Sequence, residues 1–184
     1  MSATVARWEA AGTVVIFVAG CILHFAYEWL GRSPFVGLFA AVNESVWEHL
    51  KLAFWPAMGY ALLEWLFLRK SPGFFAAKAA GICLMPVLIV VLHYGYRLVL
   101  PHHVVWLDIL IFLVAVAGGQ FASYLLLTAG LTMRRGNIAG LAVLALLAVL
   151  FGVFTLRPPR LPIFRDSTTG GYGTENAPLG QPER

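Results

Sequence analysis

Residues 138–156, IAGLAVLALLAVLFGVFTL, run for nineteen positions without a charged side chain. A helix needs roughly 20 consecutive apolar residues to cross the hydrocarbon core of a bilayer. This almost purely aliphatic stretch therefore predicts a transmembrane helix, and it indicates that lipid is the solvent around much of the chain.

The composition of the whole chain supports the same conclusion. Of its 184 residues 60% are hydrophobic and 12% are charged, and the mean hydropathy is +0.79. Soluble domains are about 45–50% apolar and about 25% charged. Four further apolar runs precede residue 138, so the length leaves room for about five helices joined by short loops.

We therefore expect an all-α integral membrane protein, a bundle of about five transmembrane helices in one domain over residues 1–156. The predicted spans cover about residues 11–30, 45–68, 74–99, 104–131 and 138–156. The short apolar run 35–42 predicts an interfacial or re-entrant segment. Residues 157–184 form a polar tail, which we expect to dock on the bundle as far as about residue 173 and to be disordered beyond it.

The basic residues predict the orientation. Loops on the side of the N-terminus carry most of the Lys and Arg, including Arg69 and Arg134, which places the N-terminus in the cytoplasm and the tail outside it. A bacterial cytoplasmic membrane is the expected location. The net charge of +4 is explained by these flanking residues, and without a nucleic-acid motif no nucleic-acid partner is expected. The first run carries His24 and Glu28, which is atypical of a cleaved signal peptide.

The five-span arrangement brings most ionisable residues to one membrane face. Only Glu9 and Glu64 are left for the opposite face among the acids before the tail. Ionisable groups at membrane depth cost a few kcal/mol each on insertion scales, so their convergence predicts a functional site. The residues at this face are His24, Glu28, Glu44, Glu48, His49, His93, His102, His103 and Asp108.

The segment Asn43–His49, with the sequence NESVWEH, has two interpretations. Ser45 and Glu48 fit a capping box that opens a helix. A cap does not need Glu44 or His49, however, so the segment also suggests acid or base chemistry, with Glu48 as a general base, Glu44 as a second acid and Ser45 as a candidate nucleophile.

The histidines suggest a site for a divalent metal ion. Three imidazoles with carboxylates suit zinc or another divalent first-row metal. His24 and Glu28 are four residues apart and share a helix face. His24, His49 and His93 are the candidate ligands, with Glu28 as a further carboxylate. Each also has a structural interpretation, as a hydrogen-bonded polar group between packed helices. The spacing matches no compact zinc signature, and the site depends on helices meeting in space.

Three motifs resemble an uncharacterised family of small bacterial polytopic membrane proteins. They are VNESVWEHLKL at residues 42–52, HFAYEW at 24–29, and PIFRDSTTGGYG at 162–173. The resemblance covers most of the chain as far as Gly173. It implies a shared fold and a shared site but no reaction.

A local resemblance links Ser45-x-x-x-His49 to the seven-helix membrane zinc hydrolases of the alkaline ceramidase and adiponectin-receptor type. Those proteins also have a His-x-x-x-His on their last helix, which this chain lacks. The resemblance implies zinc-dependent hydrolysis of a lipid-like substrate.

Two classes of function follow from these observations. The first is an intramembrane metal-dependent hydrolase of a lipid-like or small amphipathic substrate, with Glu48 and Asp108 assisting the metal and the tail as a lid over it. The second is a non-enzyme: an accessory subunit bound to a membrane protein partner or to its own copy, or a protein that binds or transports a metal or small molecule. The lack of a second polar cluster at the opposite face counts against transport.

Overall fold

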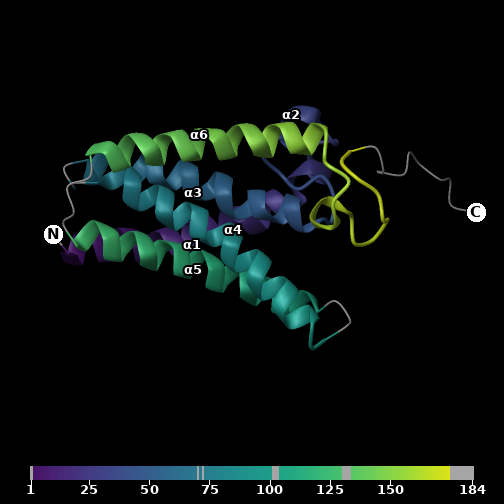
Figure 1. The fold of residues 1–184 in the computed structure, drawn as a ribbon, viewed down its shortest axis with the longest axis horizontal. Coiled ribbons are helices and arrows are strands. Elements are labelled where there is room, and N and C mark those ends of the chain that lie inside the picture. The colour runs from purple at the N-terminus through teal and green to yellow at the C-terminus, as the bar shows by residue number, and fades with distance from the viewer. Residues whose placement is uncertain (1, 70, 72, 101–103, 130–133, 175–184) are drawn as a thin grey trace, which may run out of the picture.

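The computed structural model describes residues 2–69, 71, 73–100, 104–129 and 134–174. Five long helices, one single-turn helix and a short 3-10 turn lie in this part of the chain (Figure 1). The elements are α1 (Ser2–Trp29), α2 (Pro34–Gly37), α3 (Val46–Leu68), α4 (Phe74–Arg97), α5 (Val105–Thr128), α6 (Arg134–Leu156) and η1 (Pro162–Phe164).

The long helices run up and down the bundle, each antiparallel to the next (Figure 1). α1 packs against α3 and α5, and α4 packs against α3, α5 and α6. α4 and α5 come closest at Gly81 and Gly119, where a Cβ on Gly119 would lie 2.6 Å from the carbonyl oxygen of Gly81. The predicted all-α bundle is confirmed.

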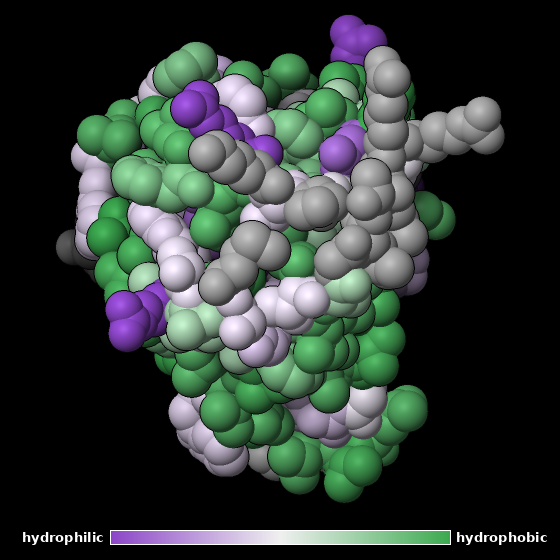
Figure 2. All heavy atoms as spheres, turned by 90° about the vertical axis from the view of Figure 1, so that its left-hand side faces the viewer, coloured by the Kyte–Doolittle hydropathy of each residue, from purple (hydrophilic) through white to green (hydrophobic). Residues whose placement is uncertain are grey.

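The outside of the bundle is hydrophobic. Val14, Leu66 and Val149 are among many large apolar side chains that are more than half exposed. Figure 2 views the end that carries the N-terminus, where hydrophobic residues dominate and hydrophilic ones form a few separate patches. A surface this apolar suits contact with lipid. Four helices, α1, α4, α5 and the stretch Gly136–Leu156 of α6, are long and apolar enough to cross a membrane.

The remaining long helix, α3, is not among these four, and it carries Glu48, Lys51 and Glu64. All three charged side chains are buried, with exposed fractions of 2%, 0% and 0%. They therefore point into the protein rather than toward its apolar surface. At 23 residues, α3 is about 35 Å long.

α1 begins at Ser2, well before the predicted start of the first span at residue 11. The prediction followed the uninterrupted apolar run and treated Glu9 as a flanking charge. In the structure Glu9 is buried inside the helix and contacts Lys78 of α4. A charge with a buried partner does not end a helix.

The start of α3 is capped as its sequence predicts. Ser45 is the N-cap, and its Oγ accepts a hydrogen bond from the Glu48 amide. The Ser45 amide donates to Asn43 Oδ1, so Asn43 supports the same turn. The Glu48 carboxylate reaches back past the cap to the amide of Val42.

The proximal part of the tail lies at the end of the bundle where α1 joins α3 (Figure 1). Phe164 of η1 is buried against Trp47 and Phe154, with ring centroids 4.7 and 5.5 Å away. Arg165 and Tyr172 form an antiparallel bridge that closes the loop between them. The predicted disorder of the last residues concerns 175–184, which lie outside the described residues.

Candidate metal site

Three side chains from separate segments meet at the tail end of the bundle. They are His24 near the end of α1, Glu44 in the connection from α2 to α3, and His49 in the first turn of α3. One candidate ligand atom from each lies within 4.8 Å of the other two. Glu44 Oε2 is 3.4 Å from His49 Nε2, and Glu44 Oε1 is 3.9 Å from His24 Nε2.

These distances are close to what a metal ion requires. Ligand bonds of 2.0–2.2 Å in a tetrahedral zinc site place neighbouring ligand atoms about 3.4 Å apart. The Glu44–His49 distance has this value, and the other ligand atoms would have to close by about an ångström. Two imidazoles and a carboxylate also supply a negative charge that attracts a dication.

The backbone at the start of α3 orients the His49 ring. His49 Nδ1 lies 2.8 Å from the carbonyl oxygen of Ser45 and donates a hydrogen bond to it. In the neutral ring this leaves the lone pair on Nε2, the atom that faces Glu44. Metal-bound histidines characteristically donate their other ring N–H in this way. His24 has no such support among the described residues, because its buried Nδ1 has no hydrogen-bond partner.

The group is open to its surroundings. The side chains of His24, His49 and Glu44 are 28%, 36% and 46% exposed. Beside His24, Phe25 is half exposed and stacks on Trp29, which is also exposed. The candidate ligands thus lie next to a surface suited to apolar chains.

The tail is hydrogen-bonded to the segment that carries Glu44. The amide and Oγ of Ser167 both donate to the carbonyl oxygen of Glu44, at 3.4 and 3.0 Å. Asn43 Nδ2 donates to the carbonyl oxygen of Gly173 at 3.0 Å. The backbone of the candidate ligand is therefore held between α3 and the tail.

Asp166 gives this part of the tail its shape. Its Oδ1 accepts hydrogen bonds from the amide and hydroxyl of Thr168 and from the amide of Thr169. Burial raises the pKa of Asp166, but these hydrogen bonds outweigh it and hold the pKa below its usual value. The side chain is therefore ionised at neutral pH and fixes the turn from Asp166 to Thr169, which contains Ser167.

Glu48, the predicted general base, takes part in a buried ion pair. Its carboxylate contacts Lys51 Nζ at 2.6 Å and accepts a hydrogen bond from Thr155 of α6. Lys51 Nζ also donates to the carbonyl oxygen of Gly37 and to Thr155. This buried pair joins α2, α3 and α6. The sequence signal for it is the spacing of Glu48 and Lys51, three residues apart on one helix face.

Two other predicted residues serve local structure. Ser45, the candidate nucleophile, is 1% exposed and caps α3, so the geometry favours the capping interpretation. Glu28 forms an exposed ion pair with Arg32, whose Nε lies 3.0 Å from Glu28 Oε2. Glu28 is not a member of the group formed by His24, Glu44 and His49.

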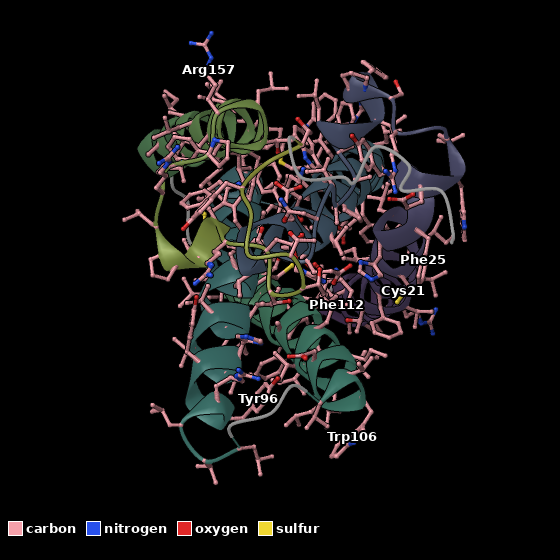
Figure 3. All side chains as sticks on the ribbon, turned by 90° about the vertical axis from the view of Figure 1, so that its right-hand side faces the viewer. Cys21, Phe25, Tyr96, Trp106, Phe112 and Arg157 are labelled. Carbon is pink, nitrogen blue, oxygen red and sulfur yellow. The ribbon has the colours of Figure 1, made fainter. Side chains whose placement is uncertain are left out.

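His93 and Asp108 form a pair of their own. His93 Nδ1 lies 2.8 Å from Asp108 Oδ1, and the Tyr96 hydroxyl donates to Asp108 Oδ2. Figure 3 shows Tyr96 and Trp106 at an end of α4 and α5 that diverges from the part of α1 bearing Phe25. The group that lies within reach of one metal ion contains Glu44 beside His24 and His49, and His93 is not a member of it. His102 and His103 lie outside the described residues.

A second polar cluster, which the sequence was expected to lack, lies at the opposite end of the bundle. Lys78 of α4 contacts both Glu9 of α1 and Glu64 of α3. Ser123 of α5 donates to Glu9 Oε1 at 2.9 Å. The expectation was wrong because Glu9 and Glu64 were treated as isolated. The signal was Lys78, a lone charge within an apolar run.

Residues 1–174 match the family model described as "Family of unknown function (DUF6512)". Comparison with curated proteins and with solved structures gave no match.

Proposed function

The chain belongs to this family of unknown function, and we propose from its own residues that it is a metal-dependent hydrolase of a lipid-like or small amphipathic substrate. The metal would be a divalent ion such as zinc, held by His24, Glu44 and His49. The observation that carries the proposal is the mutual proximity of these three ligand atoms, with His49 Nε2 left free by the hydrogen bond of Nδ1.

The ligand count favours catalysis over a purely structural metal. Structural zinc sites have four protein ligands, whereas catalytic sites have three and leave a position for water. Among the described residues, two histidines and one glutamate are such a three-ligand set. A metal ion held by these residues would lower the pKa of bound water to about 7 and would so supply a nucleophile at neutral pH.

The surroundings favour a substrate that reaches the site from the membrane. Phe25 and Trp29 offer exposed aromatic surface beside His24. An acyl chain could rest on this surface while its polar group approaches the metal. The tail segment ending at Gly173, hydrogen-bonded to residues 43 and 44, would cover the site as a lid.

We further propose that α3 spans the membrane with the other four long helices, so that five spans separate the N-terminus from the tail. α3 exceeds the roughly 30 Å hydrocarbon thickness, and its charges are paired inside the protein. The distribution of Lys and Arg favours a cytoplasmic N-terminus and an extracytoplasmic candidate metal site.

Hydrolysis is tested with full-length protein in vesicles containing fluorogenic acyl-ester and acyl-amide amphiphiles. We expect cleavage that a chelator abolishes and that added zinc restores, and we expect a loss of at least 100-fold in the Glu44→Gln variant. Glu28→Gln is the matched control. It removes an exposed carboxylate at the same end of the bundle but leaves His24, Glu44 and His49 unchanged. Metal-loaded wild-type protein that cleaves none of these amphiphiles would count against the hydrolase.

The polar cluster at the opposite end favours a second candidate, transport of the bound metal. Polar groups then lie at both ends of the bundle, with Glu9, Glu64 and Lys78 at the N-terminal end. Time-dependent accumulation of zinc inside sealed vesicles, without cleavage of any amphiphile, would replace the hydrolase with this function.

A further inference from the structure

The cluster at the N-terminal end of the bundle brings carboxylates of α1 and α3 onto one ammonium group of α4. Lys78 Nζ lies 2.7 Å from Glu9 Oε1 and also contacts Glu64 Oε2. The exposed fractions of Lys78, Glu9 and Glu64 are 1%, 4% and 0%. Lys78 is four residues from the start of α4, which places the cluster about 6 Å inside that end of the helix.

The charges that the described side chains bring to this cluster do not balance. Two ionised carboxylates and one ammonium leave a net charge of −1 in a site closed to water. An uncompensated buried charge is strongly unfavourable. The neighbouring polar groups do not supply the missing positive charge: Ser123 offers a neutral hydroxyl to Glu9, and Gln120 donates to the backbone oxygen of Glu9.

Among the described residues, the other titratable side chain that faces the cluster is Tyr60 of α3, whose hydroxyl donates to the carbonyl oxygen of Trp8 at 2.7 Å. It therefore does not serve the carboxylates. Glu9 Oε2 and Glu64 Oε1 are both buried and accept no hydrogen bond within the described part of the chain. Each is a free position for a proton, and one proton would make the cluster neutral.

We propose that Glu9 and Glu64 form a proton-binding site, in which the two carboxyl groups share one exchangeable proton beside Lys78. The proton comes from water at the N-terminal end and returns there when local opening of the helices admits water to this otherwise closed site. The carboxylates belong to α1 and α3 and the ammonium group belongs to α4. Binding and release of the proton therefore change the charge where these three helices meet. This proposal is independent of the metal site at the other end.

Infrared spectroscopy detects the proton directly, because a protonated carboxyl group has a carbonyl stretching band that a carboxylate lacks. We expect this band in full-length wild-type protein at neutral pH, a shift of the band in D₂O, and its loss at alkaline pH. The band should disappear in both Glu9→Gln and Glu64→Gln, since either change leaves one carboxylate balanced by Lys78. It should persist in Glu28→Gln.

Absence of the band in the wild type, its survival in either single variant, or its failure to shift in D₂O would overturn the proposal. Thermal unfolding gives a second test that does not depend on the spectrum. Each single variant should unfold close to the wild-type temperature, whereas the double variant should unfold well below it, because Lys78 is then buried without an anion. A double variant as stable as the wild type would contradict the charge count.

Discussion

Replacing Lys51 by alanine should lower the free energy of unfolding by about 3–5 kcal/mol, the usual cost of removing one partner of a buried ion pair. Lys51 is completely buried, and its ammonium contacts Glu48, Gly37 O and Thr155. Without it the Glu48 carboxylate remains in the protein interior without its counter-charge. Thermal and denaturant-induced unfolding of the detergent-solubilised protein, followed by circular dichroism, measure the loss.

Two controls separate this effect from the removal of side-chain volume. The double variant Glu48→Gln, Lys51→Met keeps the shapes but removes both charges, so it should recover most of the stability. Glu28→Ala breaks the exposed pair with Arg32 and should change the unfolding temperature far less. A double variant as unstable as Lys51→Ala would show that the charge pairing is not the cause.

Replacing Gly119 by leucine should destabilise the bundle by about 2–3 kcal/mol, within the range for overpacked interiors. A Cβ at this position would lie 2.6 Å from the carbonyl oxygen of Gly81 and 2.5 Å from Met85 Cγ. The backbone oxygen of Gly81 cannot rotate away, so α4 and α5 would have to separate. The same unfolding measurements report the effect.

Gly59→Leu is the matched control, since a Cβ on Gly59 would meet nothing within 4 Å. Gly59 lies exposed on α3, and leucine is the better helix former, so this variant should be as stable as the wild type or more so. Equal destabilisation by both substitutions would contradict the close approach of α4 and α5 as the cause.

The sequence was sufficient to predict the helices. Long apolar runs and the Ser45 cap are local signals, and local signals determine where a helix forms and begins. The start of α1 was missed for a reason that is not local. Glu9 becomes acceptable inside a helix only because Lys78, 69 residues further along the chain, meets it in the bundle.

The candidate site could be predicted only in part. The topology places His24, His49 and His93 at one end, but it does not specify the distances between helices at that end. The ends of α4 and α5 stay together there but diverge from the other helices (Figure 1). His93 of α4 therefore pairs with Asp108 of α5. Glu44 was proposed as an acid rather than a ligand, because the path of the connection from α2 to α3 is not encoded in a periodic pattern.

The role of Glu48 illustrates a second limit. Its position beside His49 suggested chemistry, but its spacing of three residues from Lys51 also fits an ion pair on one helix face. Packing decides between them. Thr155 of α6 and the carbonyl oxygen of Gly37 complete a polar site around Glu48 and Lys51 that residue spacing alone does not reveal.

The metal content of the purified protein tests the central claim most directly. Elemental mass spectrometry is applied to full-length protein prepared without chelators and supplied with zinc, for the wild type, His49→Ala and His93→Ala. We predict near-stoichiometric metal in the wild type and in His93→Ala, and at least a tenfold loss in His49→Ala, as large as the 10–100-fold loss seen when an outer-shell partner is removed. Wild-type protein without metal, or equal metal in all three proteins, would contradict the assignment of His24, Glu44 and His49 as the site.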